Sequence, residues 1–252
     1  MARSIIEGNP AEKRTVEGDY KINVAEFFSR TIQGEGVSTG YPAAFLRVKD
    51  CSLNCIWCDS TEVWRKGNPY TYEELYKLME ENELIEDLKK GHHLVLTGGS
   101  PLRQQKQLAQ FLALFQIRYN FIPFIEVENE CMFAPAPEFA QFISQWNNSP
   151  KLENSGMKKK LRYKPEVLKE TSQLHNAWFK FVIAEMSDWE EVEEDFIKPG
   201  LIMREQIIVM PCGSNQEELA KTREFVADLA VQQNVIYSDR AHITIWDKKT
   251  GV

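Results

Sequence analysis

The sequence has no apolar run that approaches the roughly 20 residues needed to cross a bilayer. Residues 1–20 mix charged residues with Gly and Pro and lack the apolar core of a secretory signal. Positive charge is also scarce, because 30 Lys and Arg stand against 37 Asp and Glu and leave a net charge of -7. Such a chain is poorly suited to hold duplex nucleic acid by its phosphates. We therefore expect a cytoplasmic protein that acts on a small molecule, without a membrane or nucleic-acid partner.

Cysteine is scarce as well, but three of the five cysteines crowd one segment, at Cys51, Cys55 and Cys58. The odd number and the crowding disfavour a disulfide framework and favour metal binding in a reducing compartment. Thiolates are soft ligands that suit iron–sulfur clusters and zinc. Because each iron of a 4Fe–4S cluster takes a ligand, three cysteines leave one iron open for a cofactor or substrate. The alternative is a structural zinc ion completed by Cys131, Cys212 or a histidine.

Internal repeats, low-complexity tracts and interdomain linkers are absent too, so one core is expected. Short apolar runs alternate with segments of helical spacing, which predicts an α/β fold with a parallel sheet, a partial or full βα barrel. About six strands are expected, at residues 43–48, 93–96, 121–127, 141–146, 178–183 and 206–210, with short strands at 235–237 and 243–245. Helices are expected after Thr71, capped with Glu74, and at 102–119, 165–173, 188–196 and 216–232.

Polar motifs follow the predicted strands. In a parallel sheet, ligands bind at the carboxyl ends of the strands, so these motifs should meet at one end. The cysteines follow the first strand, Thr97-Gly98-Gly99-Ser100-Pro101 the second, Glu128 the third and Ser149 the fourth. Arg47 lies inside an otherwise apolar strand and needs a partner, which favours a functional role. The glycine-spaced loop Gln33-Gly34-Glu35-Gly36 can turn sharply and bring its polar side chains together.

Taken in order, these motifs resemble the 7-carboxy-7-deazaguanine synthase family of the radical S-adenosylmethionine (SAM) superfamily. The matching segments are Gln33-Gly34-Glu35-Gly36, Arg47, the three cysteines with Trp57, Cys58-Asp59-Ser60, Thr97-Gly98-Gly99-Ser100-Pro101, Ser149-Pro150-Lys151-Leu152 and His242. The cysteine spacing indicates only the superfamily, whereas Gln-Gly-Glu-Gly and Ser-Pro-Lys-Leu indicate the family. The resemblance covers residues 23–245. It implies a modified partial βα barrel of the radical SAM type with about six parallel strands, a catalytic domain over residues 23–252 and an N-terminal extension over residues 1–22.

The resemblance also implies a reaction. A radical SAM lyase of this family converts 6-carboxy-5,6,7,8-tetrahydropterin to 7-carboxy-7-deazaguanine with loss of ammonia, in the biosynthesis of queuosine-type deazapurines. The implied cofactors are a 4Fe–4S cluster, SAM used catalytically, and Mg²⁺. The implied partners are the pterin substrate, an electron donor of the flavodoxin or ferredoxin type, and a second copy of the chain in a homodimer.

The resemblance assigns a role to each matching residue. Cys51, Cys55 and Cys58 would hold the cluster, and Ser60 would hold magnesium. Trp57, Gly98, Gly99, Ser100, Ser149 and Lys151 would bind SAM. Gln33, Glu35, Arg47, Thr97 and His242 would bind the substrate. Two positions depart from the family, which typically has Thr at Ser60 and, at Ser100, a Glu that accepts from the SAM ammonium. Ser100 keeps an acceptor but no charge, so Glu128 is expected to compensate as a SAM-binding residue.

Two alternatives remain at this stage. One is a glycyl-radical-enzyme activase, another small radical SAM enzyme, which acts on a protein backbone. Gln33-Gly34-Glu35-Gly36 and Arg47 argue against it, since a peptide substrate gives them no obvious task. The other is a non-catalytic, zinc-stabilised binding module, which iron and sulfide analysis would separate from a cluster enzyme.

Overall fold

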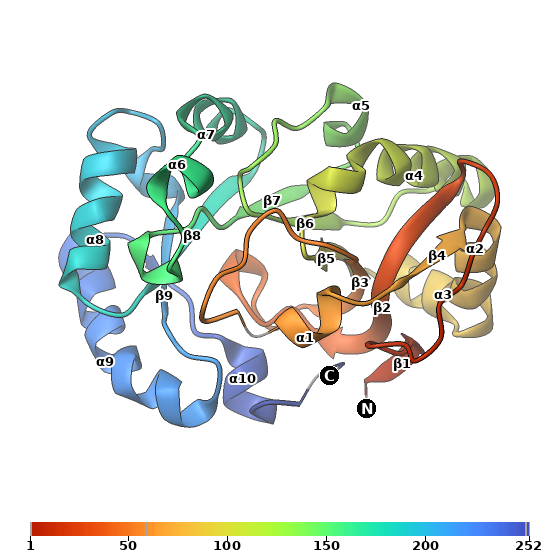
Figure 1. Cartoon of the computed structure of the whole chain (residues 1–252), viewed down its shortest axis with the longest axis horizontal. Coiled ribbons are helices and arrows are strands. Elements are labelled where there is room, and N and C mark those ends of the chain that lie inside the picture. Colours follow the sequence, from red (N-terminus) through yellow and green to blue (C-terminus); the bar gives the residue numbers. More distant parts are fainter. Residues whose placement is uncertain (1, 59, 250, 252) are drawn as a thin grey trace.

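The protein is built on one curved sheet with helices outside it (Figure 1). The computed structural model describes residues 2–58, 60–249 and 251. The strand order is β1-β2-β3-β5-β6-β7-β8-β9-β10, and β4 pairs with β2. The strands are β1 (Arg3–Ile6), β2 (Lys21–Ile32), β3 (Pro42–Val48), β4 (Asn68–Thr71), β5 (His93–Gly98), β6 (Ile125–Asn129), β7 (Gln145–Asn148), β8 (Ala177–Ile183), β9 (Ile207–Pro211) and β10 (Ile236–Tyr237). From β3 to β10 neighbouring strands run parallel, while β1, β2 and β4 pair antiparallel.

Helices surround this sheet, most of them outside it (Figure 1). They are α1 (Thr61–Trp64), α2 (Tyr72–Glu81), α3 (Leu84–Lys89), α4 (Gln105–Tyr119), α5 (Pro137–Ala140), α6 (Lys159–Arg162), α7 (Pro165–Ser172), α8 (Met186–Val192), α9 (Gln216–Gln233) and α10 (Ala241–Trp246). Aromatic contacts join the layers: the rings of Tyr76 on α2 and Phe111 on α4 stack with centroids 4.9 Å apart. Among the described residues, no helix has the length and apolar character of a membrane span.

The sequence predicted most of this framework. The expected α/β fold is confirmed, and the six main parallel strands are β3, β5, β6, β7, β8 and β9. The capping box at the start of α2 is also confirmed. The Glu74 N–H donates to Thr71 Oγ1 at 3.2 Å, and the Thr71 N–H donates to Glu74 Oε2 at 2.8 Å. Local signals sufficed here because a capping box and a buried strand are both encoded within a few residues.

Three predicted strands needed correction. The third strand, expected at 121–127, is β6, which begins only at Ile125 and ends at Asn129. The fourth strand was expected at 141–146 but is β7, which consists of Gln145, Trp146, Asn147 and Asn148. Three of these buried residues are polar, so an apolar run does not mark the strand. The expected strand at 243–245 is wrong, since this run belongs to helix α10, with Ile243 buried and Ile245 54% exposed. Three apolar residues are too few to distinguish a strand from one turn of helix.

The N-terminal residues contribute to the sheet. Strand β1 pairs with β2, and Ile6 belongs to the hydrophobic core. Arg14 donates from its backbone N–H to Asn68 Oδ1 at 2.9 Å and pairs with Glu74. The expected boundary at residue 22 therefore falls inside β2, a 12-residue strand that the sequence analysis did not identify. Its burial on both faces removes the alternation that marks a strand.

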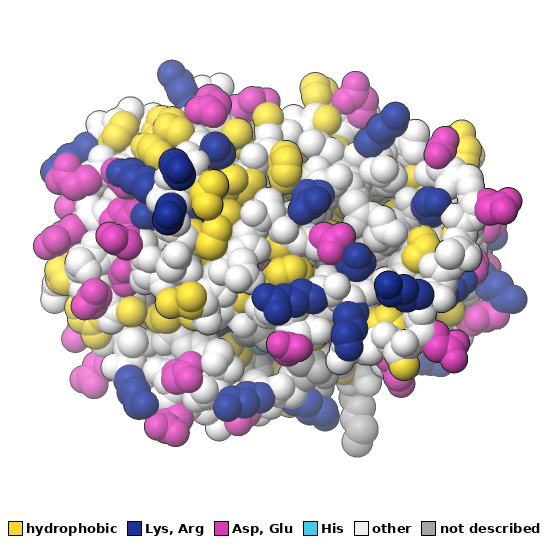
Figure 2. All heavy atoms as spheres, viewed as in Figure 1, with side chains coloured by type: hydrophobic (Ala, Val, Ile, Leu, Met, Phe, Trp, Pro, Cys, Tyr) yellow, Lys and Arg dark blue, Asp and Glu magenta, His cyan; other side chains and the backbone are white. Residues whose placement is uncertain are grey.

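The surface carries both signs of charge. On the face seen in Figure 2, Lys and Arg side chains are interspersed with Asp and Glu around small apolar areas. This view is the same as that of Figure 1, in which the loop after β3 crosses the middle of the molecule. Residues of that loop line a cavity in the protein.

Candidate active site

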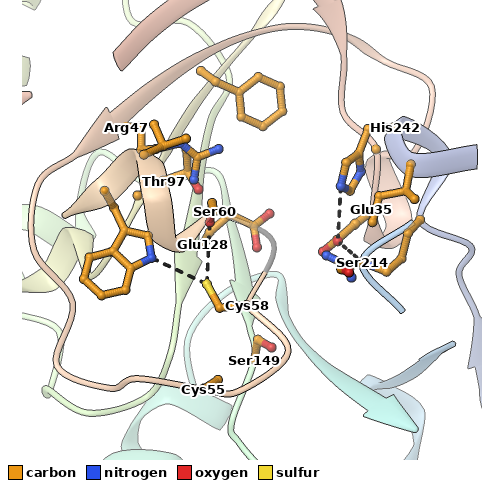
Figure 3. A pocket seen from close by; sticks show the side chains of 18 of the residues that line it. Glu35, Arg47, Cys55, Cys58, Ser60, Thr97, Glu128, Ser149, Ser214 and His242 are labelled. Carbon is orange, nitrogen blue, oxygen red and sulfur yellow. Dashed lines mark hydrogen bonds and ion pairs between the residues drawn. The ribbon is translucent and has the colours of Figure 1, made fainter. Parts of the chain in front are cut away.

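The three cysteines of the predicted cluster motif lie in the loop after β3 and line one cavity of about 480 Å³ (Figure 3). They are thiols at intermediate burial. The Leu53 N–H donates to Cys51 Sγ at 3.4 Å, and Trp64 Nε1–H donates to Cys58 Sγ at 3.5 Å. Burial raises the pKa of the Cys51 thiol and of the Cys55 thiol, so a bound metal must displace their protons.

The donor set fits a 4Fe–4S cluster better than a zinc ion. Among the described residues, no three His, Cys, Asp or Glu side chains converge as the ligands of a single metal ion do. A cluster requires no such convergence, since each thiolate binds a different iron, and hydrogen bonds to sulfur are typical of its surroundings. Cys131 and Cys212, the candidates to complete a zinc site, are not among the described residues that line the cavity. Cys131 is 1% exposed, and burial raises its pKa.

Gly98 and Gly99 bring the loop after β5 against the cysteine loop. A Cβ on Gly98 would overlap the carbonyl oxygen of Val48, and one on Gly99 would overlap that of Asp50. The Gly99 N–H instead donates to the Val48 carbonyl at 3.1 Å. Gly98 also has φ +132°, a value that residues with a Cβ rarely adopt. Both glycines line the cavity, as a contact with a cofactor requires. They are also needed for packing, because a Cβ at either position would overlap the backbone of the neighbouring segment.

Ser100 is fully buried, and a carboxylate is its neighbour. The Ser100 hydroxyl donates to Glu130 Oε1 at 2.6 Å. Glu128, the expected compensating residue, makes its bonds elsewhere, among them one to Lys180 Nζ at 2.7 Å. Glu130 was not predicted as a site residue, although the alternation of β6, continued one residue beyond its end, places Glu126, Glu128 and Glu130 on one face. The carboxylate beside Ser100 is thus two residues further along than expected.

The residues expected to bind the remainder of SAM lie together. Lys151 Nζ donates to Ser149 Oγ at 2.7 Å and lies 5.3 Å from the centroid of the Trp57 ring. Trp57 Nε1–H donates to Asn154 Oδ1 at 3.2 Å, which fixes the ring. Trp57, Ser149 and Lys151 all line the cavity. This group combines an aromatic surface with a cation and a hydroxyl, as a nucleoside with a carboxylate requires.

A buried ion-pair network lines another part of the cavity. Lys180 Nζ, whose side chain is 1% exposed, lies 2.8 Å from Glu35 Oε2 and 2.7 Å from Glu128 Oε2. Arg240 Nε donates to Glu35 Oε1 at 2.8 Å. Burial alone would lower the pKa of Lys180, but Glu128 and Glu35 outweigh it and raise this pKa. Burial raises the pKa of Glu128. Arg240 belongs to no motif, so no pattern in the sequence indicated it.

Gln33 connects this network to Glu126 beneath it. Gln33 Nε2 donates to Glu126 Oε2 at 3.0 Å and to Glu128 Oε1 at 3.3 Å, while its Oε1 accepts from the Gly34 N–H at 2.9 Å. His93 Nδ1 lies 2.6 Å from Glu126 Oε1. Burial would raise the pKa of Glu126, but hydrogen bonds led by those from His93 and Gln33 lower it. Gln33 therefore holds the start of the glycine-spaced loop against Glu126 and Glu128.

Arg47 and Thr97 face each other on neighbouring strands, in register between β3 and β5. Arg47 Nε donates to Glu26 Oε1 at 2.8 Å, which supplies the partner that an arginine inside a strand requires. Figure 3 shows Arg47 and Thr97 on one side of the cavity and His242 with Glu35 on the other. His242 Nε2 lies 4.0 Å from Glu35 Oε1.

Ser60, the expected magnesium ligand, lines the same cavity, with its Oγ 3.8 Å from Cys58 Sγ. Asp59, between them, lies outside the described residues. The cavity thus brings together every residue that the sequence analysis assigned to the site except Ser100, which is buried behind Glu130. Their roles remain predictions.

The parallel βα sheet, with three thiols after its first parallel strand and two glycines after the second, defines an iron–sulfur enzyme of the radical SAM class. The family of 4Fe-4S single cluster domains matches residues 32–124. The 7-carboxy-7-deazaguanine synthase of Pyrobaculum aerophilum is 30% identical over 233 residues, 92% of this chain and 97% of the relative. The chain belongs to the 7-carboxy-7-deazaguanine synthase family.

Two further comparisons agree with this assignment. The 7-carboxy-7-deazaguanine synthase of Hyperthermus butylicus is 29% identical, with 93% of this chain and 97% of the relative covered. The crystal structure of QueE from Escherichia coli shares the fold, with a TM-score of 0.63, 20% identity, and 89% of this chain and 96% of that chain covered. These relationships favour the family over the activase and the zinc module.

Proposed function

We propose that this cavity converts 6-carboxy-5,6,7,8-tetrahydropterin to 7-carboxy-7-deazaguanine with loss of ammonia. The observation that carries the proposal is that one cavity contains both the three-thiol loop and a set of polar side chains suited to a pterin carboxylate. Membership of the family supports the same reaction, since the relatives carry its name. The product belongs to the biosynthesis of queuosine-type deazapurines.

The cysteine loop and its neighbours would hold the cofactors. When bound, the reduced 4Fe–4S cluster and SAM supply the radical chemistry that removes a hydrogen atom from the substrate. Cys51, Cys55 and Cys58 would hold the cluster, and the sulfurs of Cys51 and Cys58 accept hydrogen bonds from the protein. Trp57 and Lys151 would lie against SAM, and apolar side chains that line the cavity would help to exclude water.

Arg47 would bind the carboxylate of the substrate. Glu26 holds its Nε, and among the described residues its Nη atoms make no hydrogen bond to protein. A guanidinium fixed in this way offers parallel N–H groups to a carboxylate. Thr97, its register partner, would add a hydroxyl beside the same group.

Glu35, Gln33 and His242 would bind the other side of the pterin. The Glu35 carboxylate is fixed by Lys180 and Arg240, and a carboxylate has about four acceptor positions, so it retains capacity for the N–H groups of a pterin edge. His242, near Glu35, would contact the ring. Ser60 would hold Mg²⁺, which leans on hydroxyl, water and substrate oxygens.

Partners and location follow from the same proposal. Reduction of the cluster requires an electron donor, for which we propose a flavodoxin or ferredoxin. We also propose a homodimer in the cytoplasm, where thiols such as those of the cysteine loop are kept reduced.

The proposed reaction is tested by product analysis. The cluster is reconstituted without oxygen, and the enzyme is incubated with 6-carboxytetrahydropterin, SAM and a reductant. We expect 7-carboxy-7-deazaguanine to form in excess of the SAM supplied, because SAM is regenerated. Cleavage of SAM without this product would refute the proposed substrate.

Arg47→Ala tests the assignment of the substrate carboxylate. We expect the KM for the carboxypterin to rise by about 10- to 100-fold, because a hydrogen-bonded charge pair is lost. Slow cleavage of SAM in the absence of substrate should continue. Arg118→Ala is the control, since Arg118 pairs with Glu73 and Glu80 on the surface. Unchanged kinetics would show that Arg47 serves only to pair with Glu26.

A further inference from the structure

A buried carboxylate, Glu130, lies between the cysteine loop and the Gly-Gly loop. It directly follows β6, is 6% exposed and lines the cavity. Its Oε1 accepts from Ser52 Oγ at 2.5 Å and from Ser100 Oγ at 2.6 Å. Ser100 Oγ in turn accepts from the Ser52 N–H at 3.0 Å and lies 3.6 Å from Cys51 Sγ. Two serines therefore fix one oxygen of Glu130 beside a predicted cluster ligand.

The other oxygen, Glu130 Oε2, is buried without a hydrogen-bond partner among the described residues. An unsatisfied oxygen of a buried carboxylate is costly, and a bound hydrogen-bond donor would remove that cost. Lys151 does not supply the donor, since its Nζ donates to Ser149 and lies over Trp57. The unsatisfied Oε2 therefore suits a cationic donor that arrives with a ligand.

We propose that Glu130 Oε2 accepts a hydrogen bond from the α-ammonium of SAM. This inference rests on the proposed function, because it takes the cavity to be the SAM site. Of the groups on SAM, the ammonium is both charged and a donor, whereas the sulfonium carries charge without any N–H or O–H. The pterin is expected between Arg47 and Glu35, which lie on opposite sides of the cavity (Figure 3). Ser100 then contributes the hydroxyl that positions the carboxylate, and Glu130 contributes the charge.

Ser100 and Glu130 form a matched pair in this arrangement. Ser100 is fully buried and its short side chain leaves space that the longer Glu130 side chain occupies from the neighbouring strand. Exchange of the two residues would place the carboxylate on the Gly-Gly loop instead. We therefore expect SAM to bind when either position carries a carboxylate. Binding should weaken when both positions lack one.

The test measures SAM binding to the anaerobically reconstituted enzyme by calorimetry, without turnover. Glu130→Gln keeps the shape and an acceptor for the serines but removes the charge. We expect it to weaken SAM binding by about 10- to 100-fold, the effect of losing a hydrogen bond to a charged group. Binding of an analogue of SAM that lacks the α-amino group should not change. Glu138→Gln, which removes the same charge from an exposed site on α5, is the control.

A second variant separates this role from support of the loop. In the Glu130→Ser variant, SAM binding should weaken. Adding Ser100→Glu should restore it, together with the change that SAM causes in the electron paramagnetic resonance spectrum of the reduced cluster. Iron and sulfide content is measured for each variant, so that loss of the cluster is recognised.

The possible outcomes distinguish this inference from the proposed function. If Glu130→Gln binds SAM as tightly as the wild type does, or weakens SAM and the deaminated analogue equally, the inference is overturned while the reaction stands. If the wild-type enzyme binds SAM but forms no deazaguanine, the proposed function fails and the role of Glu130 is still decided by the binding data. A loaded wild-type enzyme that binds no SAM overturns both.

Discussion

Lys180 shows how single residues set the chemistry of the cavity. Its ammonium is buried between Glu35 and Glu128, and Arg240 pairs with the same Glu35, so two cations balance two carboxylates. Each charge is held in one position by its neighbours, which is a requirement for binding a substrate in one orientation. Because it pairs with two carboxylates at once, Lys180 is a positioning residue.

Replacement of this residue tests the network. Lys180→Met should destabilise the fold by about 3–5 kcal/mol, because two partly buried carboxylates lose a buried partner. The pKa of Lys180 is raised above its ordinary value of 10.5, so its contribution is complete below about 10.5 and is lost as the pH rises through the higher folded value. The stability difference from the wild type should therefore stay constant between about pH 7 and pH 9 and shrink only above about 10.5.

Urea unfolding followed by circular dichroism over this pH range measures the difference. Lys221→Met is the matched control, since Lys221 is 66% exposed in a surface pair with Glu217 and its removal should have little effect. A difference that shrinks already between pH 7 and pH 9 would contradict the raised pKa.

At the scale of elements, the loop between β2 and β3 packs against α10 and the residues just before it, about 200 positions later in the chain. The Ala241 N–H donates to the Gly34 carbonyl at 2.8 Å, and the Gly36 N–H donates to Ser238 Oγ at 2.8 Å. A Cβ on Gly34 would overlap the imidazole ring of His242. The glycine at this position therefore lets the first turn of α10 approach the loop.

Gly34→Ala should displace His242 and the start of α10. We expect the KM for the carboxypterin to rise by about tenfold or more, since displacement by about 1 Å can cost 100-fold. SAM binding, on the other side of the cavity, should change little. Val37→Ala is a control in the same loop, because Val37 is 36% exposed. If Gly34→Ala left the KM unchanged, α10 would not position the substrate.

At the scale of the whole molecule, the sheet collects residues from its entire length around one cavity. Its lining runs from Glu26 near the N-terminus to residues beyond α10. The described residues of the cysteine loop before α1 form no helix or strand, and the loop contacts the Gly-Gly loop through backbone hydrogen bonds. Ligands bound here therefore connect segments that are distant in sequence, and binding should stabilise the whole fold.

Thermal unfolding tests this connection. With the cluster loaded, SAM at about 100 times its Kd should contribute about 2.7 kcal/mol. This corresponds to a rise in Tm of roughly 5–10 °C for a chain of this size. The cluster-free protein and Cys55→Ala should show no rise, because the open iron is missing. Cys212→Ala should behave as the wild type, since Cys212 is not among the described residues that line the cavity. A SAM-dependent rise in Cys55→Ala would contradict the assignment of the ligands.

Features encoded within a few residues could be predicted from the sequence. The capping box of α2, the strands β3 and β5 and the helix α9 lie where local patterns placed them. Strand β7 was shifted because its buried residues other than Trp146 are polar, and the segment containing Ile243 was misassigned because three apolar residues fit either structure. Patterns of burial identify elements only when their inner faces are apolar.

The sequence by itself determined the class of this protein, because the spacing of Cys51, Cys55 and Cys58 and the Gly-Gly loop are local properties of the chain. The tertiary structure decided which side chains meet. Arg240 pairs with Glu35 across 205 positions, and Ser100 meets Glu130 from a neighbouring strand. Such pairs depend on the order and register of the strands, which no local pattern specifies. The carboxylate beside Ser100 is consequently Glu130, directly after the neighbouring parallel strand β6, and not Glu128 within that strand.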